Sequence, residues 1–500
     1  MIPEMQRVPA GFSLAALVMF LLPATRRPWG VFIDELYYLS CSARLDWGYV
    51  DHPPLAPFIL RLSRLLFGDG LLALRLPAAL AAAVLVYLTG SFAARLGAGR
   101  AGQAIACAAL LASPVLEIVF GFFSMNAFEV LLWAAALRLL AEILLGGPAR
   151  LWLVLGVVLG VGLENKHTIV LLGAGAVLGV AVTAARRELL HPGPWLAAGI
   201  AALLALPNLL WQAAHGWPSL EFYRNADRLK NVVTPPLDAL LLQALAIGPG
   251  GLPVAITGLV LLWRRKQLRP LAVCAVALLV FMVVSGKSRP ERSAGLIPLL
   301  CSAGGVALAD WLRRPAARAA VLAWIAAGAA LFLPLPLLLF SPPMAASYAQ
   351  KIGAAQQTEA GEGKRAELPQ WLADKLAWQQ LADDVAAVRD RLPPEDRARV
   401  SYFAPSYGQA SALEWLGHLH PVYSTHNSWY LWGPPPHPIA IAIVVDGDRR
   451  ELSQLFEEVE LAATHDCDYC MPWRDDIPIF VVRRARVPLA TKWEGWKKFE

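Results

Sequence analysis

Long apolar segments recur along the first two thirds of the chain and are separated by short polar connections. Each segment is close to the roughly 20 residues that an α-helix needs to cross a bilayer. The pattern predicts about eleven transmembrane helices, at residues 8–25, 71–95, 101–120, 124–144, 149–164, 167–185, 195–211, 238–262, 269–286, 293–312 and 318–340. We therefore expect an α-helical polytopic membrane protein.

Composition supports this class. Of the 500 residues, 57% are hydrophobic and 16% are charged, whereas a soluble domain has about 25% charged residues. The net charge of +6 does not indicate a nucleic-acid partner, because most arginines fall in short loops between apolar segments. The expected partner is the membrane itself.

Basic residues follow every even-numbered predicted span, and short loops rich in Lys and Arg remain cytoplasmic. The N-terminus is therefore expected inside a bacterial inner (plasma) membrane. The first loop, 26–70, and everything after residue 340 are expected on the periplasmic side. The basic loops contain Arg95 and Arg100, Arg150, Arg186 and Arg187, Arg264 to Arg269, and Arg313 to Arg318.

Residues after 340 have ordinary polarity. We expect a transmembrane domain over 1–340, a polar linker over 341–363 and a small α/β domain over 364–500, because strands alternate with helices there. The expected elements are a helix at Trp371–Leu392, a strand at Val400–Phe403, a helix at Tyr407–Leu416, a strand at Ile439–Val445, a helix at Arg450–Leu461 and a strand at Ile479–Arg483.

The first outer loop carries the strongest candidate chemistry. Asp34 and Glu35 are adjacent, so on a helix they point about 100° apart and one of them can face a site. A carboxylate that faces a cavity can act as general base on a hydroxyl group. The alternative is a pair of solvated loop acids, which the neighbouring aromatic residues, Tyr37 among them, make less attractive.

A rigid turn follows in the same loop. Two prolines after His52 disfavour helix there and hold Asp51 and His52 in place. A histidine in this position can donate to a phosphate oxygen. The alternative is a plain turn at the entry to a helix.

Charged residues also interrupt the apolar pattern elsewhere on the expected outer face. Lys166 can contact a lipid phosphate or pair with Glu164, and ionisable groups at membrane depth are usually functional. Arg289 and Arg292 form a cationic cluster, for which interfacial snorkelling is the alternative.

Three further features are candidates for the site. Asn126 and Glu129 stand at the head of the fourth span, where Glu129 adds a carboxylate or caps the helix. The stretch from His426 through Asn427 to Trp429 suits stacking on a sugar, or else packing against the membrane domain. Cys467 and Cys470 are expected to form a disulfide rather than half a zinc site.

Nucleotides are not normally available outside the cytoplasm, and the sequence contains no P-loop and no dinucleotide-binding motif. An activated substrate on that face must therefore arrive on a lipid carrier. No cofactor is certain. Paired acids on the first loop can hold a divalent cation, and no particular metal site is indicated.

Several motifs together resemble glycosyltransferase family 39, the bacterial branch related to protein O-mannosyltransferases and the lipid A aminoarabinose transferase. They are DELYY (34–38), GYVDHPPL (48–55), LENKHT (163–168), PNLLWQAAHGWP (207–218), GPGGLP (248–253) and THNSWYLWGP (425–434). The resemblance implies a GT-C fold, a polyprenyl-phosphate sugar donor and a catalytic carboxylate at Asp34. The chain departs from the family at His52, where the aminoarabinose enzymes have lysine, and at Asn126, where relatives often have aspartate.

The resulting hypothesis is a membrane glycosyltransferase. Asp34 would act as general base while a hydroxyl or phosphate group on a lipid, glycan or protein acceptor displaces polyprenyl phosphate with inversion. The alternative is a transporter or flippase, although transporters commonly show internal repeats and this sequence shows none. The sequence leaves the sugar, the acceptor and the oligomeric state open.

Overall fold

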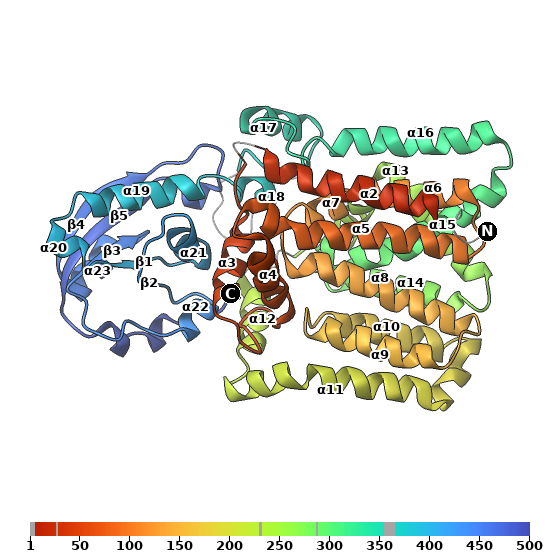
Figure 1. The fold of residues 1–500 in the computed structure, drawn as a ribbon, viewed down its shortest axis with the longest axis horizontal. Helices are drawn as coiled ribbons and strands as arrows, with labels where there is room; N and C mark the ends of the chain where they lie inside the picture. Colours follow the sequence, from red (N-terminus) through yellow and green to blue (C-terminus); the bar gives the residue numbers. More distant parts are fainter. Residues whose placement is uncertain (1–5, 27–28, 230–232, 287–288, 355–365) are drawn as a thin grey trace.

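The structure is a computed structural model that describes residues 6–26, 29–229, 233–286, 289–354 and 366–500. A bundle of roughly parallel and antiparallel helices forms one part, and a five-stranded sheet with its covering helices forms the other (Figure 1). The sheet domain packs against one end of the bundle, called the domain end below. Helix α2 (Arg7–Leu21) begins at the opposite end (Figure 1).

All of the predicted apolar segments are helical. Six helices in the described residues are long and apolar enough to cross a membrane, or up to eight if each of two bent pairs is one span. The predicted number of eleven is therefore not reached by this measure. The bundle helices after α2 are α5 (Leu71–Arg95), α6 (Arg100–Leu111), α7 (Pro114–Phe120), α8 (Met125–Leu144), α9 (Arg150–Leu163), α10 (Ile169–Ala181), α11 (Pro192–Ala214), α13 (Pro236–Arg264), α14 (Arg269–Val284), α15 (Ile297–Trp311) and α16 (Pro315–Phe332).

Of the predicted spans that are broken, two have breaks that contact each other. Helices α6 and α7 meet at 66°, because Pro114 cannot continue the helix that precedes it. Helix α13 is interrupted at Gly248, whose φ of 82° favours glycine. A Cβ atom at Gly248 would lie 2.7 Å from Pro114 Cδ, and Ser113 Oγ donates to the Ala246 carbonyl at 2.9 Å. The two interruptions therefore pack against each other within the bundle, and one accepts a hydrogen bond from the other.

Three shorter helices lie at the domain end: α3 (Ile33–Ala43), α4 (Leu55–Phe67) and α12 (Pro218–Leu229) (Figure 1). Helix α4 buries Ala56 and Leu60 but exposes Phe58, Leu65 and Phe67. A short helix with one exposed apolar face is typical of a membrane interface. The predicted first outer loop, 26–70, therefore contains two helices and lies against the end of the bundle.

The small C-terminal α/β domain is present. Its sheet has the order β2-β1-β3-β5-β4; β1 is parallel to β2 and β3, and β5 is antiparallel to β3 and β4. The strands are β1 (Ser401–Phe403), β2 (Val422–Tyr423), β3 (Ile441–Val445), β4 (Phe456–His465) and β5 (Ile477–Ala485). The helices after α16 are α17 (Pro342–Lys351), α18 (Gln370–Ala373), α19 (Trp378–Asp390), α20 (Pro394–Arg397), α21 (Tyr407–Trp415), α22 (Ser428–Leu431) and α23 (Arg449–Leu455).

Two sequence predictions for this region are wrong in detail. The helix predicted to Leu461 ends at Leu455, because the following residues pair along β5 as strand β4 and this pairing overrides their helix propensity. The helix predicted from Trp371 is interrupted at Ala377, whose φ is 63°. The predicted linker begins with helix α17, and its residues 355–363 lie outside the described residues.

Helix α3 belongs to both parts of the molecule. Leu36, Tyr37 and Cys41 pack in one apolar cluster with Trp378 and other residues of the C-terminal domain. Tyr38 and Leu39 pack instead in the core of the bundle. Every residue from Glu35 to Ser42 is buried. The helix that contains the predicted general base is therefore fixed from both sides.

A buried ion pair anchors the beginning of this helix. Glu35 and Arg75 are both 0% exposed, and Arg75 Nε and Nη2 each donate to the Glu35 carboxylate at 2.8 Å. The backbone N–H groups of Phe32 and Phe123 donate to the same carboxylate at 2.8 and 2.9 Å. Burial alone raises the pKa of Glu35, but Arg75, Lys375 and these hydrogen bonds outweigh it and lower the pKa.

We predict that Arg75→Met destabilises the protein by about 3–5 kcal/mol, since it leaves a buried acid without its cation. The measurement is the thermal unfolding midpoint of the detergent-solubilised protein. The matched control is Arg484→Met, because Arg484 pairs with Glu457 and Glu458 on the exposed edge of the sheet. Equal midpoints for both variants would contradict a structural role for the buried pair.

Candidate active site

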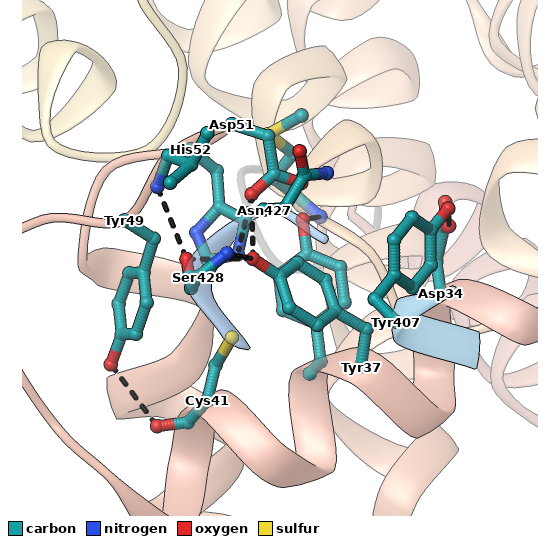
Figure 2. Close-up of polar contacts among 12 residues, drawn as sticks. Asp34, Tyr37, Cys41, Tyr49, Asp51, His52, Tyr407, Asn427 and Ser428 are labelled. Carbon is teal, nitrogen blue, oxygen red and sulfur yellow. Dashed lines mark hydrogen bonds and ion pairs between the residues drawn. The ribbon is translucent and has the colours of Figure 1, made fainter. Parts of the chain in front are cut away.

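Asp34 lies in the first turn of α3, next to Glu35 but on a different face. Its Oδ1 atom accepts a hydrogen bond from the Tyr407 hydroxyl of the C-terminal domain at 3.0 Å (Figure 2). Asp34 is only partly buried, whereas Glu35 is enclosed and accepts four hydrogen bonds. The Glu35 oxygen atoms accept from Arg75 and from two backbone N–H groups, so the environment of Glu35 differs from that of Asp34.

Asp51 lies near Tyr37, which follows Asp34 by almost one helical turn. The Tyr37 hydroxyl donates to Asp51 Oδ1 at 2.9 Å and lies 2.7 Å from Ser428 Oγ (Figure 2). Ser428 in turn accepts the Val50 N–H at 3.1 Å. The turn that carries Asp51 is thus tied to α3 and to the C-terminal domain together.

His52 is enclosed by aromatic rings. It is 1% exposed, and the ring centroids of Tyr38 and Tyr49 lie 4.8 and 4.7 Å from its own. Burial lowers the pKa of His52, although Asp51 opposes the shift. His52 Nδ1 is 3.0 Å from the Pro53 carbonyl. His52 is thus packed inside the turn, and its predicted phosphate contact stays a prediction.

A second polar cluster joins the head of α8 to the connection between α9 and α10. Lys166 Nζ donates to Asn126 Oδ1 and to Glu129 Oε2, both at 2.7 Å. Thr168 also donates to Glu129. Lys166 therefore pairs with Glu129 and not with Glu164, which is the partner that the sequence suggested. Glu164 contributes its carbonyl oxygen, which accepts the Leu55 N–H at 2.9 Å.

Helices α11 and α12 lie between the Asp51 turn and the Lys166–Glu129 cluster. His167 lies 3.0 Å from Asn208 Oδ1 on α11 and 3.0 Å from the Tyr223 hydroxyl on α12. Burial raises the pKa of Tyr223, and the charges of Asp51 and Glu129 raise it further. Tyr223 is therefore within electrostatic range of both clusters. His167, Asn208 and Tyr223 lie within motifs or loops of interest but were not predicted as site residues.

The predicted cationic cluster also reaches this region in part. Arg292 interacts electrostatically with Glu129 and with Asp227 of α12. Arg292 lies in a short 3-10 helix, η3 (Pro290–Leu296), and Arg289 directly precedes that helix. Arg292 thus lies on the same side of the molecule as Lys166.

The predicted sugar-stacking residues are buried and have protein partners. His426 is 6% exposed, Asn427 is 1% exposed and Trp429 is 3% exposed. His426 Nε2 and Asn427 Nδ2 lie 3.0 and 3.1 Å from the Glu500 carbonyl, and the Trp429 ring N–H donates to Ser411. The packing alternative fits this environment, and stacking on a sugar does not.

Lys375 was missed by sequence reasoning, although it lies next to the first turn of α3. Its carbonyl accepts the Gly30 N–H at 3.0 Å. Its ammonium group is 5.3 Å from the Phe32 ring centroid and 4.9 Å from that of Phe122. Burial and the neighbouring Arg75 lower the pKa of Lys375 to about 7. An isolated basic residue in a polar stretch gives no sequence signal of such burial.

Two remaining predictions concern metals and cysteines. Cys467 and Cys470 are paired as a disulfide. No group of three or more His, Cys, Asp or Glu side chains that could hold a metal occurs among the residues that the structure describes. Of the two acids considered for a divalent cation, Glu35 already accepts two hydrogen bonds from Arg75.

The fold defines the structural class as a polytopic helical bundle of the GT-C type with a small C-terminal sheet domain. The ArnT crystal structure from Cupriavidus metallidurans bound to undecaprenyl phosphate matches 94% of this chain and 97% of its own, with a TM-score of 0.63 and 15% identity. The apo structure of the same protein matches with a TM-score of 0.62 and 16% identity. At these identities the likeness establishes the fold.

Sequence comparisons agree and confirm the resemblance that the motifs indicated. Residues 51–211 match the family model described as dolichyl-phosphate-mannose-protein mannosyltransferase. The lipid A galacturonosyltransferase RgtD of Rhizobium johnstonii is 31% identical over 210 residues. That match covers 41% of this chain and 42% of the length of RgtD.

We predict that Lys375→Met stabilises the protein at pH 7 and removes a pH dependence. An unfolded lysine has a pKa near 10.4, so between pH 7 and about 10 the unfolded chain binds more protons at this residue than the folded chain does. The free energy of unfolding therefore rises with pH across that window, and the full penalty is present at and below its lower end.

The measurement is the thermal midpoint from pH 7 to pH 9 for wild type and variant. The thermal midpoint of the variant should be higher than that of wild type at pH 7 and should increase less between pH 7 and pH 9. Lys351→Met, at the exposed end of α17, is the control and should follow the wild-type curve. Parallel curves for Lys375→Met and wild type would show that the ammonium group is not desolvated.

Proposed function

We propose that this protein transfers a sugar from a polyprenyl-phosphate donor to an acceptor hydroxyl or phosphate group. The observation that carries the proposal is the position of Asp34. It is a half-buried carboxylate at the domain end of the bundle that accepts a hydrogen bond from the Tyr407 hydroxyl and lies next to the Glu35–Arg75 pair. The family match and the ArnT-like fold support a lipid-linked donor.

In the proposed reaction Asp34 removes the proton of the acceptor hydroxyl as its oxygen attacks the anomeric carbon. The bond between that carbon and the phosphate oxygen breaks, and polyprenyl phosphate leaves with the electron pair. A single displacement with one base predicts inversion at the anomeric carbon. Phosphate needs no protonation to leave, so cations that stabilise its oxygens matter more than an acid.

Two cations are candidates for that role. Lys166 is 14% exposed and stands between Asn126 and Glu129, and Arg292 is within electrostatic range of Glu129. Two tyrosines lie between Asp34 and these cations. Tyr38 interacts electrostatically with Asp34 and Asp51, and Tyr223 interacts with Asp51 and Glu129. We assign deprotonation of the acceptor to Asp34, and stabilisation of the donor phosphate to Lys166 and Arg292.

The proposed orientation places the domain end outside the cytoplasm of a bacterial inner membrane. Helix α2 begins at the far end of the bundle (Figure 1), and the arginine-rich connection between α5 and α6 contains Arg95 and Arg100. Short basic connections remain cytoplasmic. A lipid carrier then meets Asp34 at the outer leaflet. The acceptor is proposed to be an envelope lipid, in keeping with the lipid A transferase relative.

We predict that Asp34→Asn lowers transfer by about 10²- to 10⁴-fold, the usual contribution of a general base. The amide keeps the size of the side chain but cannot accept the proton. Sugar transfer is measured in vesicles, and folding is checked by size exclusion and thermal unfolding. Asp46→Asn, an exposed acid just beyond α3, is the matched control and should retain activity. Near-normal transfer by Asp34→Asn would rule out the base role.

The same assay separates a transferase from a transporter. Purified protein is given a polyprenyl-phosphate sugar labelled in the sugar, together with extracted envelope lipid, and release of free polyprenyl phosphate is followed. A transferase releases the carrier only when acceptor is present. Movement of the intact donor between leaflets without carrier release would favour the flippase alternative.

A further inference from the structure

We propose that the C-terminal domain completes the active site, with Tyr407 as the positioning residue for Asp34. The inference rests on the proposed function, because it assigns a role to a residue that acts through the proposed base. It adds a structural requirement to the transfer reaction. Helix α3 and helix α21, whose contacting residues are more than 370 positions apart, must be docked correctly on each other.

The direct contact is a phenol donor on a carboxylate. Tyr407 Oη lies 3.0 Å from Asp34 Oδ1, which is hydrogen-bonding distance. Figure 2 shows the two side chains next to each other, with Asp34 on α3 and Tyr407 arriving from the C-terminal domain. A donor on Oδ1 favours one rotamer of the carboxylate and so orients Asp34.

Tyr407 is itself held in place by its own domain. It is the first residue of α21, where Ser406 and Gln409 form a capping box. The Tyr407 N–H donates to His426 Nδ1 at 3.3 Å, and its ring centroid lies 4.9 Å from that of His426. This assigns a purpose to the buried His426, which the sequence had suggested as a sugar contact.

Close packing brings α21 against α3 at the required point. A Cβ atom at Gly408 would lie 2.5 Å from Ile33 Cγ1, so only glycine allows this approach. Ile33 directly precedes Asp34, and Gly408 directly follows Tyr407. The Ile33 N–H also donates to the Asp374 carbonyl of the C-terminal domain at 3.1 Å. The domain thus holds the backbone beside Asp34 as well as its side chain.

The same domain reaches the second carboxylate through Tyr37. A phenol has one proton and a carboxylate only accepts, so Tyr37 donates to Asp51 and the Ser428 hydroxyl donates to Tyr37. The Ser428 N–H donates to the Tyr37 oxygen as well, at 3.1 Å. The rings of Tyr37 and Tyr407 lie 4.7 Å apart. Hydroxyl groups of the C-terminal domain therefore support both Asp34 and Asp51.

The test is Tyr407→Phe, which keeps the ring contacts with Tyr37 and His426 and removes only the donor. We expect kcat to fall by about 10- to 100-fold, the worth of one hydrogen bond to a charged group, with KM for the donor nearly unchanged. The acidic limb of the pH–rate profile should move to higher pH, because the carboxylate loses a donor that stabilises its charged form. A purely structural role would not move that limb.

Tyr430→Phe is the matched control. Tyr430 lies in the same domain, and its ring packs on Trp493 at 6.0 Å, away from the two carboxylates. Its kinetics and pH profile should match wild type. Thermal midpoints of all variants show whether any loss of rate reflects unfolding.

The outcomes distinguish this inference from the proposed function. If Asp34→Asn is inactive while Tyr407→Phe has wild-type kcat and an unmoved acidic limb, the positioning role is overturned and the base role stands. If Asp34→Asn is active, the base role fails, whatever Tyr407→Phe does. Faster transfer by Tyr407→Phe would also overturn the inference, since it would show that the hydroxyl blocks the carboxylate.

Discussion

The placement of the candidate base depends on one buried ion pair. Glu35 and Arg75 neutralise each other where neither can reach water, and the cost of separating such a pair is high. Because Arg75 lies in α5 and Phe123 lies before α8, the Glu35 carboxylate fixes the first turn of α3 to two bundle elements at once. The neighbouring Asp34 cannot share that environment, so it faces the side of α3 that the C-terminal domain covers.

This arrangement makes α3 a structural link between two domains and not a surface helix of either. Ser40 lies 2.7 Å from Glu414 Oε2, and Arg44 pairs with the same carboxylate while its guanidinium lies over the Trp432 ring. Glu414 is on α21, the helix that begins with Tyr407. The contacts along α3 therefore set the register of α21, and through it the position of the Tyr407 hydroxyl at the other end of the same interface.

The sequence predicted what is local in the chain. The apolar segments, the acid pair at Asp34 and the rigid turn at Asp51 are visible as periodicity, adjacency and proline chemistry. Strand β4 was missed because its pairing with β5 is a tertiary effect that its helix-favouring residues do not show. The partner of Lys166 was missed because Glu164 is close in sequence, whereas Glu129 is close in space.

The supporting residues of the site were harder to predict for a related reason. Ser428 lies in the stretch whose aromatic and amide residues suggested sugar binding, and Tyr407 begins a predicted helix, but neither hydroxyl group gives a sequence signal of its own. Their role follows only from the docking of a domain more than 360 residues away along the chain. Sequence reasoning that assigns chemistry to the first loop alone therefore identifies the carboxylates but not the groups that hold them.

The chain departs from the pattern of the aminoarabinose enzymes at His52 and Asn126, and both departures change the charge of the site. Where those relatives have a lysine, this chain has His52, whose pKa is lowered by burial, so one positive charge is absent. Where relatives often have an aspartate, this chain has Asn126, so one negative charge is absent. Asn126 still accepts a hydrogen bond from Lys166 through its amide oxygen, and Glu129, three residues later on the same face of α8, supplies the charge. In a region where unpaired charges are costly, Glu129 thus keeps Lys166 paired although Asn126 carries no charge. Glu129 thereby also interacts electrostatically with Arg292.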